Sequence, residues 1–149
     1  MKLIIQIPSY NEEKSLPQTI DQLPRKVKGF DTVEWLIVDD GSWDRTVEVA
    51  KESGVDHIVK LPQNRGLSRA FSAGIAECLR LGADVIVNTD ADNQYNAEDI
   101  PLLTGPILSG EADMVIGSGQ SRVLHIFHRQ RKCFRCGGVL WFGRSAGRM

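Results

Sequence analysis

Five short, mostly apolar runs alternate with amphipathic stretches along this chain, and this alternation restricts the fold more than any other feature. The runs are residues 3–7, 33–38, 57–61, 84–89 and 113–117. Near-continuous apolar runs of this length are typical of strands that are buried on both faces. Strands that alternate with helices predict an α/β fold with a mostly parallel sheet and right-handed crossovers.

The stretches between the runs carry apolar residues three or four positions apart, which is the spacing of an amphipathic helix. Prolines and glycines mark the expected ends of these helices, for example Pro24, Gly54 and Gly82. The apolar stripes are Leu16, Ile20, Leu23 and Val27; Val47 and Ala50; Leu67, Ala70, Phe71, Gly74, Ile75, Cys78 and Leu79; and Ile100, Leu103 and Ile107. We therefore expect helices on both faces of a Rossmann-like sheet.

Polar loops follow the first four runs, and three of the four loops are acidic. They are residues 8–13, 39–42, 64–66 and 90–94. In open parallel sheets, ligands bind outside the carboxyl ends of the strands. We therefore expect the four loops to converge on one binding site.

The fourth loop contains two aspartates one residue apart, Asp90 and Asp92. In an extended chain their side chains point to the same side, so both can approach one cation. Carboxylates together with substrate phosphates are typical ligands of Mg²⁺ or Mn²⁺. Such a metal would offset the charge of a departing diphosphate. An Asp-x-Asp sequence is common by chance, so this motif alone is weak.

Taken together, the four loops resemble those of the family 2 glycosyltransferases, especially the polyprenol-phosphate sugar synthases. The matching motifs are Pro8-x-Tyr10-Asn11-Glu12-Glu13, Val38-Asp39-Asp40-Gly41-Ser42-x-Asp44-x-Thr46, Asn64-Arg65-Gly66 and Thr89-Asp90-Ala91-Asp92. The resemblance implies a GT-A fold over residues 1–118. It also implies an enzyme that transfers a sugar from a UDP- or GDP-linked donor with Mg²⁺ or Mn²⁺.

The resemblance also assigns roles to individual residues. It places Pro8, Tyr10 and Glu12 in the nucleotide pocket, Asp40 against the base or ribose, Asp90, Ala91 and Asp92 against the metal and sugar diphosphate, and Gln94 on the metal side. The residue types agree with these roles. Tyr10 offers a face for stacking, and the carboxylates of Glu12 and Asp40 accept hydrogen bonds from base or ribose donors.

Several of these loop residues also have purely structural interpretations. Glu12 and Glu13 can favour a helix N-terminus through the helix dipole. Asp39 can brace its turn, and Asp44 can cap the following helix. Arg65 is either a solvated charge or a phosphate contact.

The last segment of the chain has a different composition. Residues 121–149 contain seven Lys or Arg and no Asp or Glu, which leaves residues 1–120 with 11 basic and 19 acidic residues. We therefore separate residues 119–149, as a basic tail outside the family resemblance, from an incomplete GT-A domain at residues 1–118. The tail is expected to be disordered or the product of a truncation or frameshift.

Two other interpretations of the tail stay open. His125, His128, Cys133 and Cys136 could form a zinc site, although the two pairs are unusually close in sequence. Basic residues interleaved with aromatic ones could instead bind anionic lipid or nucleic acid. The overall net charge of −1 gives no reason to expect a nucleic-acid partner.

The acceptor and the catalytic base are less defined. No acid follows Asp113, so the tail supplies no carboxylate base. A polyprenyl phosphate acceptor is already an anion and needs such a base less than a glycan acceptor does. Three cysteines and no apolar run of about 18 residues favour a cytoplasmic protein without a membrane span. The resemblance to enzymes with lipid acceptors implies a place at the inner face of the membrane, with peripheral association.

Two alternatives to a glycosyltransferase stay open. One is a nucleotide-binding fragment without turnover. The other is a sugar nucleotidyltransferase, which normally has a glycine-rich loop after the first strand. No glycine occurs in residues 8–13, and this absence also argues against a G-x-G-x-x-G dehydrogenase.

Overall fold

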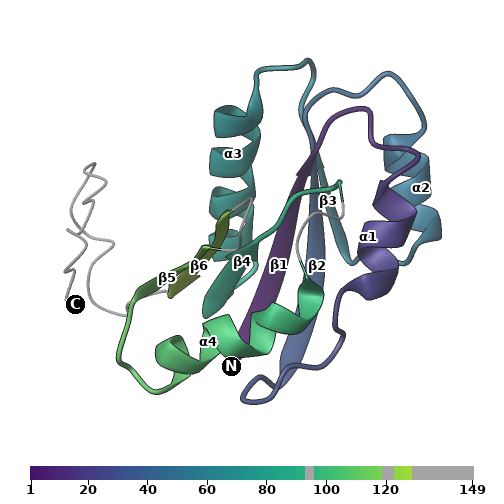
Figure 1. Ribbon diagram of the computed structural model, residues 1–149. Helices are drawn as coiled ribbons and strands as arrows, with labels where there is room; N and C mark the ends of the chain where they lie inside the picture. The colour runs from purple at the N-terminus through teal and green to yellow at the C-terminus, as the bar shows by residue number, and fades with distance from the viewer. Residues whose placement is uncertain (93–95, 119–122, 129–149) are drawn as a thin grey trace.

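The computed structural model describes residues 1–92, 96–118 and 123–128. In these residues, six strands form one sheet in the order β3-β2-β1-β4-β6-β5 (Figure 1). The strands are β1 (Lys2–Ser9), β2 (Thr32–Asp39), β3 (His57–Lys60), β4 (Val85–Asn88), β5 (Met114–Ser118) and β6 (Val123–His128). The five strands expected from the apolar runs are all present.

The half of the sheet that carries the first four strands is parallel, as predicted. β1 lies between β2 and β4, and β2 also pairs with β3. The sixth strand was not predicted. β6 inserts antiparallel between β4 and β5, so β5 runs in the same direction as β4 without touching it. β6 falls within the segment that we had separated as a tail.

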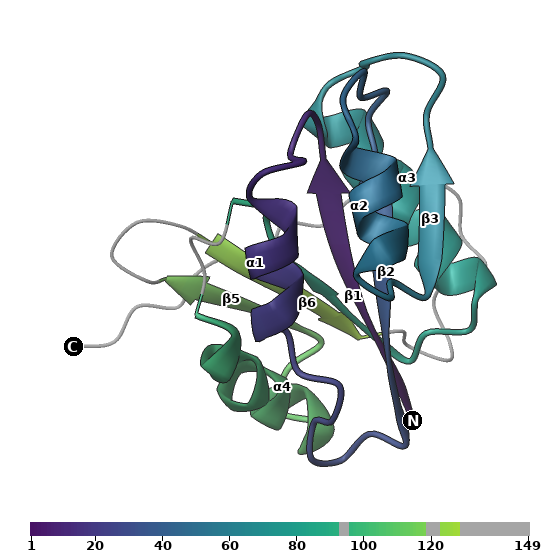
Figure 2. The same ribbon diagram turned by 90° about the vertical axis from the view of Figure 1, so that its right-hand side faces the viewer.

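Helices cover both faces of the sheet, as expected. They are α1 (Leu16–Gln22), α2 (Thr46–Glu52), α3 (Leu67–Arg80) and α4 (Ile100–Leu108), with a 3₁₀ turn η1 (Ala97–Asp99) before α4. α3 covers one face, and α1, α2 and α4 lie over the other (Figure 2). α1 has Pro17 in its first turn and ends before Pro24, which disfavours helical backbone in the residue before it.

The two faces of β1 belong to two separate hydrophobic clusters. Leu3, Ile5 and Ile7 pack toward α1, α2 and α4, whereas Ile4 packs toward α3. These side chains are completely buried, and each contributes about 1.5–3 kcal/mol relative to an exposed position. The continuous apolar run arises because both faces of this central strand are covered.

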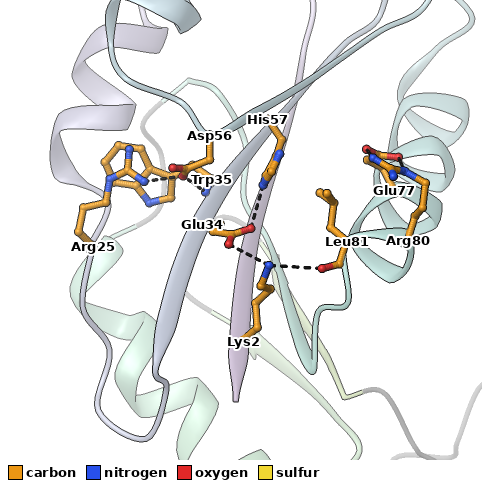
Figure 3. Close-up of polar contacts among 9 residues, drawn as sticks. All are labelled: Lys2, Arg25, Glu34, Trp35, Asp56, His57, Glu77, Arg80 and Leu81. Atoms are coloured by element: carbon orange, nitrogen blue, oxygen red, sulfur yellow. Dashed lines mark hydrogen bonds and ion pairs between the residues drawn. The ribbon is translucent and has the colours of Figure 1, made fainter.

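Polar contacts join strands and loops at the opposite end of the sheet from the predicted site. The Lys2 ammonium and the His57 ring both contact the Glu34 carboxylate, which links β1, β2 and β3 (Figure 3). The Arg25 guanidinium lies 3.3 Å from the centroid of the Trp35 ring. The contacts of Glu34 therefore hold three neighbouring strands together at this end of the sheet.

Two predictions about the helices are wrong. Val27 was expected on the stripe of the first helix, but α1 ends at Gln22 and Val27 is buried outside it. Leu67 was expected on the buried stripe of α3 but is 65% exposed. It is the first residue of α3, directly after the loop, and it is not among the buried residues of the helix. Ala70, Gly74 and Cys78 form the buried side of α3 instead.

Candidate functional site

A pocket of about 290 Å³ opens at the carboxyl edge of the parallel strands. All four loops that follow β1 to β4 contribute to it, so their expected convergence is confirmed. The lining residues are Pro8, Ser9, Tyr10, Glu12, Asp40, Asn64, Gly66, Leu67, Ala70, Asp90, Ala91 and Asp92. Every predicted site residue in the described part of the chain is among them, whereas Gln94 lies outside the described residues.

Asn11 connects the first loop to the second. Its backbone is left-handed, with φ of 55°, a conformation that asparagine tolerates better than most residues. Its amide donates to Ser42 Oγ at 2.9 Å, and its side-chain oxygen accepts from the Trp43 amide at 3.1 Å. Asn11 and Ser42 therefore fix the turn that presents Tyr10 and Glu12 to the pocket.

Asp44 and Thr46 hold the same turn from the start of α2. The Glu12 amide donates to Thr46 Oγ1 at 2.8 Å, and the Glu13 amide donates to Asp44 Oδ2 at 3.2 Å. The Thr46 hydroxyl and amide both donate to Asp44 Oδ1, at 2.5 and 3.0 Å. Burial of Asp44 opposes its charge, but these hydrogen bonds outweigh burial and lower its pKa. The N-cap of α2 is Arg45, so Asp44 is not the helix cap that we considered, and it braces the turn before the helix instead.

Asp40 supports the third loop. Its two carboxylate oxygens accept from the Arg65 amide at 2.9 Å and the Gly66 amide at 2.7 Å. Gly41 brings the loops close together, because a Cβ there would lie 2.7 Å from the Asn64 nitrogen. Each carboxylate oxygen can accept a second hydrogen bond, so Asp40 can brace the loop and still meet a ligand in the pocket.

Asp39 is not among the residues that line the pocket, and it braces its own turn. Its Oδ1 accepts from the Ser42 amide at 3.0 Å, which confirms the structural role considered for it. The carboxylate is completely buried, and its Oδ2 has no hydrogen-bond partner among the described residues. The two neighbouring aspartates after β2 therefore have different surroundings.

The Asp90-Ala91-Asp92 segment differs from the extended form that we assumed. β4 ends at Asn88, and Ala91 and Asp92 lie in a turn. Asp90, Ala91 and Asp92 nevertheless all line the pocket, and Ala91 also belongs to the buried core cluster. Both carboxylates therefore reach the pocket because the chain turns after β4. The alternation of side chains along an extended strand, which we had expected, is not the cause.

The donor set suits a hard cation shared with a phosphate ligand. Among the described residues, no three His, Cys, Asp or Glu side chains gather into a complete metal site. Mg²⁺ and Mn²⁺ do not need one, because one or two carboxylates and substrate phosphate oxygens commonly hold them. The carboxylates of Asp90 and Asp92 therefore fit such an ion together with the oxygens of a bound diphosphate.

Leu67 and Ala70 also line the pocket and were not predicted as site residues. We had assigned both to the hydrophobic stripe of α3. Their position in the sequence could have indicated this role. A helix that begins directly after the third loop has its first turn at the carboxyl edge of the sheet, where the pocket lies. Cys78, more than two helical turns beyond Ala70, is completely buried, and burial raises the pKa of its thiol to about 12.

The sequence profile described as "Glycosyl transferase family 2" matches residues 4–143. This match continues past residue 118, where we had ended the resemblance; our division of the chain there stays a prediction. No helix in the described part of the chain is both long and apolar enough to cross a membrane.

Curated and solved proteins of similar sequence or fold agree with the profile. The chain is 36% identical to undecaprenyl-phosphate mannosyltransferase of Micrococcus luteus, over 79% of this chain and 48% of that protein. It is 37% identical to dolichol-phosphate mannosyltransferase of Pyrococcus furiosus, over 79% of this chain and 33% of that protein. A structure of glucosyl-3-phosphoglycerate synthase from Mycobacterium tuberculosis with Mn²⁺ and UDP has a TM-score of 0.61, at 28% identity, over 74% of this chain and 40% of that one.

The chain spans about half the length, or less, of the curated relatives that it matches. Its sheet, its four converging loops and its profile match all point to the same assignment. The chain has a GT-A-like α/β fold and belongs to the family 2 glycosyltransferases.

Proposed function

We propose that this chain binds a nucleotide diphosphate sugar and a divalent metal, and that the whole protein transfers the sugar to a polyprenyl phosphate. The observation that supports this most strongly is the pocket itself, because seven residues predicted from three separate loops line one cavity. In this proposal, Pro8, Tyr10 and Glu12 receive the nucleotide with Asp40. Asp90 and Asp92 face the diphosphate.

The reaction is a substitution at the anomeric carbon of the donor sugar. An oxygen of the acceptor phosphate forms the new bond to that carbon. The bond from the carbon to the β-phosphate oxygen breaks, and the nucleoside diphosphate leaves with the electron pair. A bound Mg²⁺ or Mn²⁺ would offset the negative charge that collects on this diphosphate.

The nature of the acceptor follows from the proton balance. A phosphate oxygen is already an anion, so its attack releases no proton that a base must take up. A glycan hydroxyl would need such a base. The curated relatives include transferases named for undecaprenyl phosphate and dolichol phosphate. A lipid acceptor would bring the reaction to the membrane surface, where the whole protein would associate peripherally.

The binding half of the proposal is tested by titrating the chain with UDP and with GDP by calorimetry, with and without Mn²⁺. We expect one of the two nucleotides to bind and Mn²⁺ to strengthen that binding. Asp92→Asn removes the charge but keeps the shape of the side chain, so the metal-dependent gain should disappear. Loss of a metal-orienting or metal-binding group typically costs about 10- to 100-fold in affinity or more.

Asp21→Asn is the matched control, because Asp21 is an exposed aspartate on α1 outside the pocket. It should bind nucleotide and metal like the unsubstituted chain. If no nucleotide binds in a metal-dependent way, the proposed function is wrong. Binding without turnover in transfer assays on undecaprenyl phosphate would instead favour a nucleotide-binding fragment that needs the rest of the protein.

A further inference from the structure

A buried hydrogen bond joins α1 to the middle of the Asp90-Ala91-Asp92 turn. The hydroxyl of Thr19, which is 4% exposed, lies 2.8 Å from the carbonyl oxygen of Ala91. The same hydroxyl lies 3.3 Å from the Ser15 carbonyl, one helical turn earlier. A hydroxyl donates one hydrogen, and 2.8 Å is the usual length of such a bond whereas 3.3 Å is long. Ala91 is therefore the main acceptor.

This bond acts on Asp92 through the planar peptide group. The Ala91 carbonyl and the Asp92 amide belong to the same rigid unit. Fixing the direction of the Ala91 carbonyl therefore fixes the orientation of this peptide plane. The Cα of Asp92 lies in the same plane, so the plane sets the position from which the Asp92 side chain extends. At the other side of the motif, the Thr89 amide donates to the Gln6 carbonyl of β1 at 3.0 Å. The turn is thus held from the sheet and from α1.

The same helix is attached to the loop that carries Glu12. The Leu16 amide donates to the Glu12 carbonyl at 2.9 Å, and the Ser15 hydroxyl donates to the Glu12 carboxylate. The Thr19 amide donates to the Ser15 carbonyl at 3.1 Å. α1 therefore spans from the nucleotide loop to the aspartate turn, and Thr19 is its contact with that turn.

We infer that Thr19 is a positioning residue, which aims the Asp92 carboxylate at the divalent cation through the Ala91–Asp92 peptide. This inference rests on the proposed function, since it requires that Asp92 faces a metal. Thr19 itself is not among the residues that line the pocket. Its loss should consequently weaken the binding of Mn²⁺ and leave the metal-free binding of nucleotide unchanged.

The test compares Thr19→Val, which keeps the shape and removes the hydroxyl, with Thr19→Ser, which keeps the hydroxyl. Mn²⁺ is titrated into each variant at saturating UDP or GDP, whichever binds. Thr19→Val should weaken Mn²⁺ binding by about 10- to 100-fold, as for other groups that orient metal ligands. Thr19→Ser should restore the affinity. In the metal-free chain, the NMR signal of the Asp92 amide should shift in Thr19→Val alone.

Thr104→Val is the matched control for buried threonine. Thr104 is completely buried in α4, and its hydroxyl contacts only the carbonyls of Ile100 and Pro101 in its own helix, at 3.0 and 3.1 Å, among the described residues. It should leave Mn²⁺ affinity and the Asp92 signal unchanged.

The possible failures are distinguishable. If Thr19→Val binds Mn²⁺ like the unsubstituted chain, or if Thr104→Val loses as much affinity, the inference about Thr19 is wrong while the proposed function stands. If the unsubstituted chain shows no Mn²⁺-dependent nucleotide binding, the proposed function and the role of Thr19 are both overturned.

Discussion

At the scale of single residues, Glu34 shows how environment sets the charge of a carboxylate in this fold. Lys2 Nζ lies 2.9 Å from one of its oxygens, and His57 Nε2 lies 2.8 Å from the other (Figure 3). Burial of Glu34 opposes its charge, but the hydrogen bonds from Lys2 and His57 outweigh burial and lower its pKa from the usual 4.5. The charged form therefore stabilises the fold.

Glu34→Gln should lower the free energy of unfolding near neutral pH. The expected loss is about 1.5–3 kcal/mol, the usual value of hydrogen bonds to a charged group. A lowered pKa in the folded state gives stability that is present above pH 4.5 and is lost as the pH falls through the folded pKa. The difference between the two chains should therefore shrink in acid, as measured by urea unfolding at several pH values.

Glu111→Gln is the control for this charge change, because Glu111 is exposed. It should change the unfolding free energy little at any pH, as is usual for surface substitutions. A stability difference for Glu34→Gln that persists unchanged below the folded pKa would show that the carboxylate charge is not its source.

At the scale of elements, the close approach of α3 to the sheet depends on Gly74. A Cβ at this position would clash with Gln6 Oε1 and lie 2.8 Å from Val38 Cγ2. Gln6 is completely buried, and its side-chain amide donates to Asn88 Oδ1 at 2.9 Å. The glycine therefore leaves room for a polar pair that connects β1 and β4 beneath the pocket.

Gly74→Ala should destabilise the fold, although alanine is normally the better helix former. Overpacking of a core typically costs about 1–3 kcal/mol, which exceeds the gain in helix propensity of about 1 kcal/mol. The shift in the midpoint of urea unfolding measures the effect.

Gly105→Ala in α4 separates propensity from packing. A Cβ at Gly105 would meet no described atom within 4 Å, so this substitution should be neutral or stabilising by up to about 1 kcal/mol. If both substitutions stabilise the chain, α3 does not pack as closely on the sheet as the structure indicates.

At the scale of the whole molecule, the pocket joins loops from four separate parts of the chain. A ligand that contacts all four binds only the folded state and should therefore raise the unfolding temperature. At a concentration 100 times the dissociation constant the gain is about 2.7 kcal/mol. For a domain of this size, each kcal/mol corresponds to about 2–4 °C.

Differential scanning fluorimetry with the bound nucleotide and Mn²⁺ should accordingly show a rise of several degrees. Removing the metal with EDTA should reverse the metal-dependent part of this rise. Asp92→Asn should keep the unfolding temperature of the free chain and lose that part. An equal metal-dependent rise in Asp92→Asn would show that the cation binds elsewhere.

The local parts of this description were predictable from the sequence. Apolar periodicity depends on residues close together in the chain, so it located the five expected strands and the four helices. The rule that ligands bind at the carboxyl ends of parallel strands then brought Pro8, Tyr10, Glu12 and Asp40 to one edge with Asp90, Ala91 and Asp92. The same reasoning missed β6, because residues 123–128 fell within the segment that its composition had set aside as a tail. The antiparallel place of β6 between β4 and β5 has no local sign in the sequence.

By itself, the sequence determined the kind of elements, their order and the edge at which polar loops gather, because these follow from local spacing and the direction of the chain. Only the tertiary structure decided which groups hold that edge in shape. Thr19 and Ala91 are 72 residues apart, and Asp40 and Gly66 are 26 apart. Hydrogen bonds between such residues depend on how whole elements pack, and the spacing of residues along the chain carries no information about that packing.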